Sequence, residues 1–123
     1  MAEGRREVTV RGVERELAWS PEALRAAVKR LAYPERDGLA YLRQSGSYPS
    51  LDELALTLDD ELGRVRTGLS ADHPLLRLDK QVSEMSGREN AALWDAEALN
   101  TEAWIAVRRV AIEALAELDQ RPI

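Results

Sequence analysis

The sequence predicts one mainly α-helical domain with a small β component. A length of 123 residues fits a single domain over residues 1–123 and leaves little room for a second. The interior must be aliphatic, because the chain has no Phe and only three Trp and three Tyr among 45% hydrophobic residues. Over most of the chain the apolar residues recur at helical spacing between start and stop signals, which favours helices packed on one another.

The β component is predicted at two places, the first of which is the N-terminal segment. Residues 7–19 alternate apolar and polar side chains on either side of Arg11-Gly12. This alternation is typical of two short strands joined by a turn. An extended β arm gives the same pattern, so the sequence leaves a hairpin and an arm open.

Start and stop signals predict the first two helices. Ser20 is a preferred N-cap residue, and Pro21 fits the first helical position, where its missing N–H has no partner in any case. Pro34 ends this helix and begins a second one, expected over residues 35–45. Gly46 follows in the position of a C-terminal cap.

Two short helices joined by a turn are predicted next. The third helix begins at Ser50 in a capping-box pattern with Glu53. Asp59-Asp60 interrupts it, and a fourth helix follows over residues 61–71. Both helices are amphipathic, as two helices that cross near a right angle must be.

A hairpin and one long helix complete the chain. Residues 75–79 and 92–94 are strand candidates, and the polar segment between them contains a Ser86-Gly87 turn. The last helix, over residues 100–119, is the clearest element of all, because its apolar residues recur at helical spacing throughout.

Composition excludes several function classes. Without cysteine there is no thiolate metal site, no disulfide and no thiol catalysis. No apolar run approaches the roughly 20 residues that span a bilayer. No secretory leader is recognisable, so we expect a cytoplasmic protein without membrane contact. The net charge of −5 disfavours indiscriminate binding to nucleic acid.

The sequence contains no recognisable catalytic set. His73 is the single histidine and stands before Pro74, so a capping role is favoured over that of a metal ligand or general base. Neither GxGxxG nor GxxxxGK[ST] occurs, so nucleotide phosphates have no recognisable cradle. We therefore predict a protein that is not an enzyme and that carries no cofactor and no metal.

One segment carries a family resemblance. In chain order it contains Leu31-Ala32-Tyr33-Pro34-Glu35-Arg36, Gly46, Glu53-Leu54-Ala55, and Val65 with Leu69. Over roughly residues 30–80 it resembles the core of winged-helix transcriptional regulators of the arsenic-repressor-like type, and more loosely that of the multiple-antibiotic-resistance-repressor type. The resemblance implies a winged helix-turn-helix over residues 20–95, with the hairpin after the fourth helix as its wing.

In that family the fourth helix enters the major groove, so the resemblance implies that helix 61–71 reads double-stranded DNA. Polar residues of this helix, and basic residues in or beside the wing, would contact bases and phosphates. The implied DNA-binding residues are Arg64, Arg66, Thr67, Ser70, Arg77, Lys80 and Arg88. Ordinary solvated side chains are the alternative for each of them. Asp59, Asp60 and Glu61 suit a helix N-terminus but repel a nearby phosphate.

The last helix indicates a homodimer. Its apolar residues cover about half of the circumference, whereas packing on one core needs a stripe of only about 100°. One side would face the domain core and the other a second copy, as in many symmetric assemblies. The predicted dimer-interface residues are Trp104, Val107, Arg108, Ala111, Leu115 and Leu118. A helix buried more deeply in its own subunit is the alternative. Arg108, within the apolar arc, would pair with an acid across the interface or extend its head to water.

The sequence thus predicts a function and leaves one alternative. The prediction is a homodimeric DNA-binding transcriptional regulator that reads the major groove with helix 61–71. The alternative is a winged-helix module that binds another protein instead of DNA, as an adaptor, an inhibitor or an anti-repressor. The acidic residues 59–61 and the apolar excess of the last helix favour this alternative.

Overall fold

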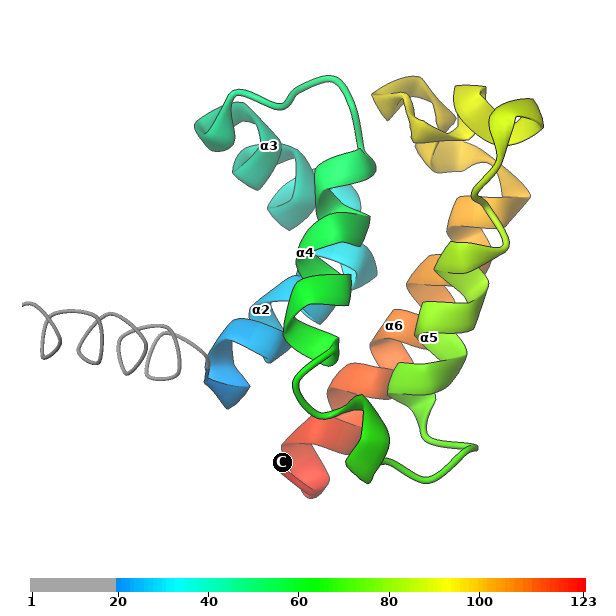
Figure 1. Ribbon diagram of the computed structural model, residues 1–123. Coiled ribbons are helices and arrows are strands. Elements are labelled where there is room, and N and C mark those ends of the chain that lie inside the picture. The colour runs from blue at the N-terminus through cyan, green and yellow to red at the C-terminus, as the bar shows by residue number, and fades with distance from the viewer. Residues whose placement is uncertain (1–19) are drawn as a thin grey trace, which may run out of the picture.

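The computed structural model describes residues 20–123, and this part of the chain is helical almost throughout (Figure 1). The α-helices are α2 (Pro21–Ala32), α3 (Leu39–Ser45), α4 (Asp52–Leu62), α5 (Pro74–Ser83) and α6 (Glu102–Gln120). A π-helical turn and three 3-10 segments complete the order: Pro34–Gly38, Arg66–Gly68, Arg88–Trp94 and Ala96–Asn100. The prediction of a mainly helical chain is confirmed. The hairpin or arm predicted over residues 7–19 lies outside the described residues.

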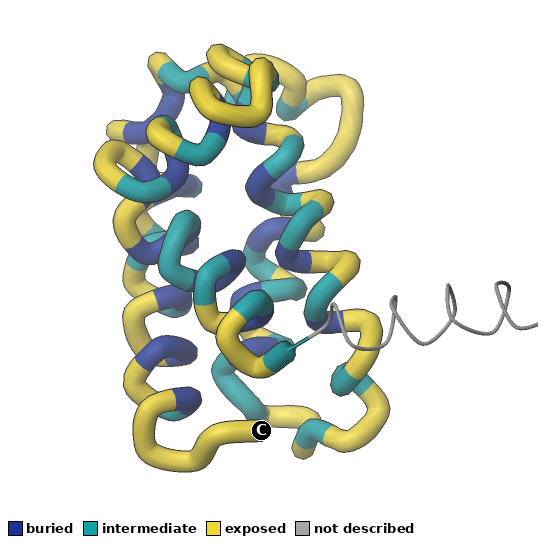
Figure 2. The backbone as a smooth tube through the Cα atoms, turned by 90° about the vertical axis from the view of Figure 1, so that its left-hand side faces the viewer, coloured by how far each residue is buried: buried dark blue, intermediate teal, exposed yellow. Residues whose placement is uncertain are grey.

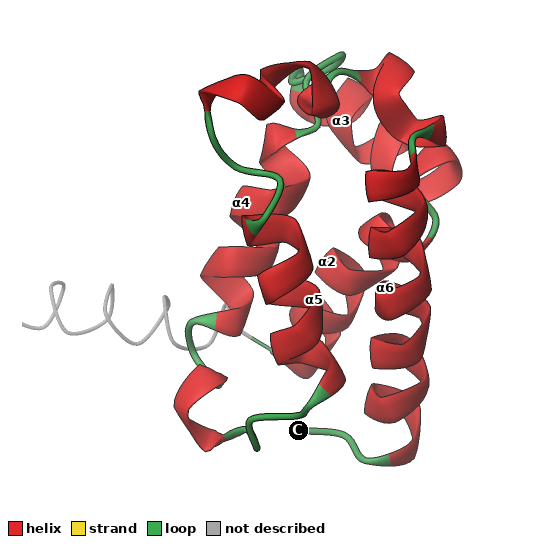
Figure 3. Cartoon of the chain, turned by 90° about the vertical axis from the view of Figure 1, so that its right-hand side faces the viewer, coloured by secondary structure: helices red, strands yellow, loops and turns green. Residues whose placement is uncertain are grey.

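The helices enclose one aliphatic core. Helix α2 packs against both α4 and α6, and α5 lies alongside α6 (Figures 1 and 3). The buried residues lie on the inward sides of these helices, and the exposed ones face outward (Figure 2). Each α-helix contributes to the core, as shown by Leu24, Leu42, Leu58, Leu78 and Val107. The core is therefore closed by helix-on-helix packing, as an aliphatic composition favours.

The capping signals at the start of the described chain are confirmed. Ser20 Oγ accepts a hydrogen bond from the Ala23 backbone N–H at 3.1 Å, and Pro21 is the first residue of α2. Gly46 ends α3 with a φ of 79°, in the left-handed region that favours glycine. The helix predicted over residues 35–45 is present, but its first part is the π-helical turn rather than regular α-helix.

Gly38 allows the π-helical turn to approach α2 closely. A Cβ atom at this position would lie 3.0 Å from the Arg30 carbonyl oxygen and 3.0 Å from Leu54 Cδ1. The carbonyl oxygen belongs to the backbone and cannot rotate away as a flexible side chain can. The absence of a side chain at Gly38 thus sets the spacing at the point where α2, α3 and α4 meet.

Gly38→Ala is expected to lower the free energy of unfolding by about 1–3 kcal/mol, because the added methyl group overpacks a buried contact. Gly68→Ala is the matched control, since a Cβ atom there meets no heavy atom within 4 Å. Urea denaturation of both variants measures the difference. Equal stability of the two variants would show that the contact at Gly38 relaxes freely.

Helix α4 differs from the prediction at its C-terminal end. It continues through Asp59 and Asp60 to Leu62. Leu54, Leu58 and Leu62 follow one another at four-residue spacing and are all buried, so a single helix buries one continuous apolar stripe. The two aspartates lie on the exposed side of this helix, where carboxylates do not interrupt it.

The predicted fourth helix over residues 61–71 is wrong. Glu61 and Leu62 are the end of α4. After Leu62 the chain turns, and from there to residue 71 only Arg66–Gly68 is helical, as a short 3-10 segment. Two glycines, Gly63 and Gly68, disfavour a helix here. The apolar Val65 and Leu69, which suggested helical periodicity, pack against the core from the turn instead. The two crossed helices predicted over residues 50–71 are therefore one helix followed by a turn.

The predicted wing is also wrong. Residues 75–79 belong to α5, and residues 92–94 belong to the 3-10 segment Arg88–Trp94. A short apolar run is ambiguous between strand and helix, and here Leu75, Leu78 and Val82 form the buried side of a helix. The capping role predicted for His73 is confirmed, because its Nδ1 accepts a hydrogen bond from the Leu75 backbone N–H at 3.1 Å.

The long C-terminal helix is confirmed, but the interface assigned to it is not. Of the predicted dimer-interface residues, the five apolar ones are buried in the chain's own core: Trp104, Val107, Ala111, Leu115 and Leu118. Arg108 donates a hydrogen bond from Nη1 to the Leu99 carbonyl oxygen at 2.6 Å, within the same chain. These residues fit the alternative of a helix buried in its own subunit, since both α2 and α5 pack against α6, although Ile105 and Ile112 of the same helix stay exposed.

Candidate ligand groove between α4 and α5

The residues predicted to bind DNA lie on several separate elements. Arg64 is in the turn after α4, Arg66 and Thr67 are in the 3-10 segment Arg66–Gly68, and Ser70 is in the loop that follows. Arg77 and Lys80 belong to α5, and Arg88 begins the next 3-10 segment. No helix within residues 61–71 presents these side chains together, so the structure lacks the element on which the DNA-binding prediction depends.

Two of these arginines bind carboxylates of their own chain. Arg66 Nη2 lies 2.9 Å from Asp59 Oδ1 and 3.4 Å from Asp79 Oδ1. Arg77 Nη2 donates to Glu113 Oε2 at 2.6 Å, which joins α5 to α6. Both guanidinium groups are thus already engaged in ion pairs between elements of the fold.

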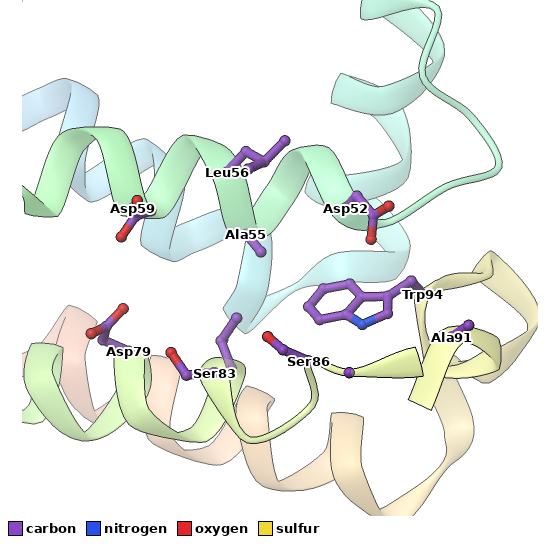
Figure 4. Close-up of a pocket in the computed structure, with 11 residues that line it drawn as sticks. Asp52, Ala55, Leu56, Asp59, Asp79, Ser83, Ser86, Ala91 and Trp94 are labelled. Carbon is purple, nitrogen blue, oxygen red and sulfur yellow. The ribbon is translucent and has the colours of Figure 1, made fainter. Parts of the chain in front are cut away.

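A groove of about 540 Å³ runs between α4 and α5 and ends at the 3-10 segment Arg88–Trp94 (Figure 4). We refer to it as the α4–α5 groove. Its lining residues are Asp52, Ala55, Leu56, Asp59, Asp79, Val82, Ser83, Ser86, Gly87, Ala91 and Trp94. They combine apolar side chains with three carboxylates, and no basic side chain is among them.

The apolar part of the groove is formed by Ala55 and Val82 between the helices, by Trp94 at one end and by Leu56 at the outer rim of α4 (Figure 4). Leu56 is 58% exposed, the highest value among the large hydrophobic residues that the structure describes as exposed. Trp94 forms the end wall (Figure 4). Its Nε1 donates to the Met85 carbonyl oxygen at 2.9 Å, and its ring packs edge-to-face on Trp104 at a centroid distance of 5.7 Å. The indole is therefore held in place before any ligand arrives.

The carboxylates of the groove lie at two ends, one where Arg66 binds them and one where no cation does within residues 20–123. Asp59 on α4 and Asp79 on α5 face one another across the groove (Figure 4), and Arg66 bridges them. The hydrogen bond to Asp59 raises the pKa of Arg66 above its usual value, against the opposing effect of burial. Asp52 lies near the Trp94 end and forms no ion pair within residues 20–123.

Backbone hydrogen bonds fix the Trp94 end. The Leu51 N–H donates to the Trp94 carbonyl oxygen at 2.6 Å, and the Ala96 N–H donates to the Pro49 carbonyl oxygen at 3.0 Å. An isolated antiparallel bridge pairs Ser50 with Asp95 between them. The segment before α4 is thus joined directly to the segment that carries Trp94.

The sequence predictions missed this groove, although part of its signal was present. Asp52, Leu56 and Asp59 are spaced at 4 and 3 residues, which places them on one face of a helix. Asp79 and Ser83 have the same relation on α5. The shared face of Asp79 and Ser83 follows only if residues 74–83 form a helix, and the sequence predicts a strand over residues 75–79.

Among residues 20–123, no three His, Cys, Asp or Glu side chains are grouped so that they could hold a metal ion. In the same residues, no helix combines the length and apolarity that crossing a bilayer requires. The three groove aspartates are therefore a charged lining rather than a metal-ligand set.

Comparison of the chain with protein-family models, with curated proteins and with solved structures gives no match. The geometry of the α4–α5 groove is therefore the observation from which a function is inferred.

Proposed function

We propose that this domain is a protein-interaction module, and that the α4–α5 groove binds a basic segment of a partner protein. The segment would carry at least one Arg or Lys together with a neighbouring aliphatic side chain. This proposal keeps the protein-binding alternative that the sequence leaves open, but it does not include a wing. DNA binding and homodimerisation stay predictions, now without the elements that were assigned to them.

The observation that carries the proposal is the Arg66 bridge. A guanidinium already sits between Asp59 and Asp79, so one end of the groove contains the kind of contact that a basic ligand would form. Arginine suits this position, because its planar fork of donors reaches two acceptors at once. Asp52 offers a third carboxylate at the other end, and Trp94 offers an aromatic face beside it.

The apolar lining supports a peptide rather than a simple cation. Leu56 and Trp94 supply apolar surface in a groove whose ends are polar, and aromatic residues contribute strongly to protein recognition. A net charge of −5 increases the rate at which basic segments approach. The same charge repels phosphate backbones, so the groove favours a protein partner over nucleic acid.

The proposal is tested by selecting ligands from a random peptide library displayed on phage, with the full chain as target. We expect the recovered peptides to be enriched in Arg or Lys next to aliphatic residues. Binding of synthetic copies is then measured by fluorescence anisotropy at two salt concentrations. Affinity should fall as salt rises, because exposed charges are screened.

Two matched double variants locate the binding site. Asp52→Asn with Leu56→Ala removes one charge and one apolar anchor from the groove, and we expect an affinity loss of about tenfold or more. Glu97→Gln with Ile112→Ala makes the same chemical change at exposed positions outside the groove lining, and should bind like the parent chain. Peptides without a basic preference, or equal loss in both double variants, would refute the proposal.

A further inference from the structure

A second depression lies between the C-terminal half of α2 and helix α3, and its charge is opposite to that of the α4–α5 groove. It has a volume of about 270 Å³, and we refer to it as the α2–α3 notch. Its lining residues are Ala26, Lys29, Arg30, Asp37, Ala40, Tyr41 and Gln44. The proposed protein-binding function uses none of them.

The notch is built by the π-helical turn and by Gly38. The close approach of Gly38 to the Arg30 carbonyl brings the start of α3 against the end of α2. As a result the Arg30 guanidinium lies over the Tyr41 ring, 3.8 Å from its centroid. π-helical turns of this kind occur frequently at functional sites, because they redirect the side chains that follow.

Arg30 of α2 rests on the Tyr41 ring, which α3 carries and α4 anchors. The Tyr41 hydroxyl lies 3.4 Å from Thr57 Oγ1 on α4, and Thr57 Oγ1 in turn donates to the Glu53 carbonyl oxygen at 2.8 Å. The ring is therefore anchored at its hydroxyl as well as at its backbone. Stacking occupies one face of the guanidinium and leaves its N–H edge available to a planar or tetrahedral oxyanion.

The positive charge of the notch is not neutralised from within. Lys29 and Arg30 form no ion pair with any residue in the described range 20–123. Asp37 is the carboxylate of the lining, and Arg36 Nη2 binds it at 3.0 Å. Glu53 stands on the neighbouring helix, where its Oε2 lies 3.5 Å from Thr57 Oγ1. Two adjacent cations thus face the notch, and its own acid already has a partner.

We propose that the α2–α3 notch binds a phosphoryl group of a small soluble ligand. Arg30 would contact two phosphoryl oxygens through its fork of donors, Lys29 would add a point charge, and the Gln44 amide would donate to a third oxygen. The volume lies just below the usual range for drug-sized ligands, so it suits a phosphoryl group with a small attachment. The site does not depend on the proposed protein-binding groove.

The probe is inorganic pyrophosphate, titrated into the ¹⁵N-labelled full chain while sodium chloride keeps the ionic strength constant. We expect saturable chemical-shift changes at the backbone amides of Lys29, Arg30 and Tyr41, at the Gln44 side-chain amide, and at the Arg30 Nε. Lys29→Gln with Arg30→Gln should weaken binding about tenfold or more, because charge-assisted hydrogen bonds are lost.

Two further variants separate binding from folding. Arg30→Lys keeps the charge and loses the stacked fork, so it should bind with intermediate affinity. Lys80→Gln with Arg88→Gln removes the same charge from exposed positions outside the notch and should bind like the parent chain. If this control weakens binding as much as the notch variant, or if sodium chloride alone produces the same shifts, the proposal is overturned.

The source of the phosphoryl group is tested in parallel. Vesicles containing phosphatidic acid and a double-stranded DNA fragment are titrated under the same conditions. Binding to either of them without saturable binding of pyrophosphate would also overturn the proposal, because it would indicate an extended anionic surface rather than a notch for a small ligand.

Discussion

Trp104→Ala is expected to lower the free energy of unfolding by about 3–5 kcal/mol, the largest effect of any substitution considered for this chain. Trp104 is 0% exposed and is the largest fully buried side chain among the described residues. Its Nε1 donates to the Leu93 carbonyl oxygen at 2.6 Å, and its ring meets Trp94 at an interplanar angle of 85°. Alanine would leave a large cavity and a carbonyl oxygen without its donor.

Trp104→Phe separates these two contributions. Phenylalanine keeps most of the apolar volume and the edge-to-face contact, but it cannot donate to Leu93. We expect its loss to be smaller than that of alanine, and the hydrogen-bond part to account for about 1–3 kcal/mol. Urea denaturation followed by circular dichroism measures both variants. A Trp104→Ala protein within about 1 kcal/mol of the parent would contradict the buried position of this residue.

Leu58→Ala is expected to cost about 2–5 kcal/mol, because Leu58 lies in the middle of the buried stripe of α4 and is only 1% exposed. Leu56→Ala is its matched control, as the same change two residues away on the same helix. Since Leu56 is 58% exposed, its removal should alter the free energy of unfolding by less than about 0.5 kcal/mol.

Leu58→Ala and Leu56→Ala also separate an effect on folding from an effect on peptide binding. Leu56→Ala should keep the stability of the parent chain and weaken binding of the selected basic peptides, whereas Leu58→Ala should lose stability. Urea denaturation and peptide anisotropy are measured on both proteins. A large stability loss for Leu56→Ala would show that α4 is oriented differently, with Leu56 toward the core.

Much of the helical content was predictable, because it depends on local signals. Ser20 with Pro21, and Gly46 after α3, mark helix ends through backbone geometry that neighbouring residues alone determine. The long α6 was likewise evident from its periodicity. Its role was not, since a wide apolar arc fits a dimer and a deeply buried helix equally well. The packing of α2 and α5 against α6 shows that the residues assigned to an interface lie in the chain's own core, and homodimerisation stays a prediction.

The errors occurred where distant packing decides the outcome. In the sequence Asp59-Asp60 suggests a helix break, yet Leu62 continues the buried stripe of Leu54 and Leu58, and burial of that stripe keeps the helix intact. The apolar start of α5 predicts a strand as readily as a helix, because five residues do not distinguish the period of a strand from that of a helix. Both candidate sites form between successive α-helices that irregular turns join, so a local pattern indicates at most one wall of each site.

The bonds at the two ends of the α4–α5 groove have a consequence for recognition. Arg66 joins Asp59 to Asp79 at one end, and the Leu51 N–H joins the Trp94 carbonyl at the other. These contacts fix the distance between the two walls at both ends, so the groove is preorganised before a peptide binds. The entropic cost of ordering then falls on the peptide. Differences in affinity among related peptides should therefore arise mainly from their dissociation rates.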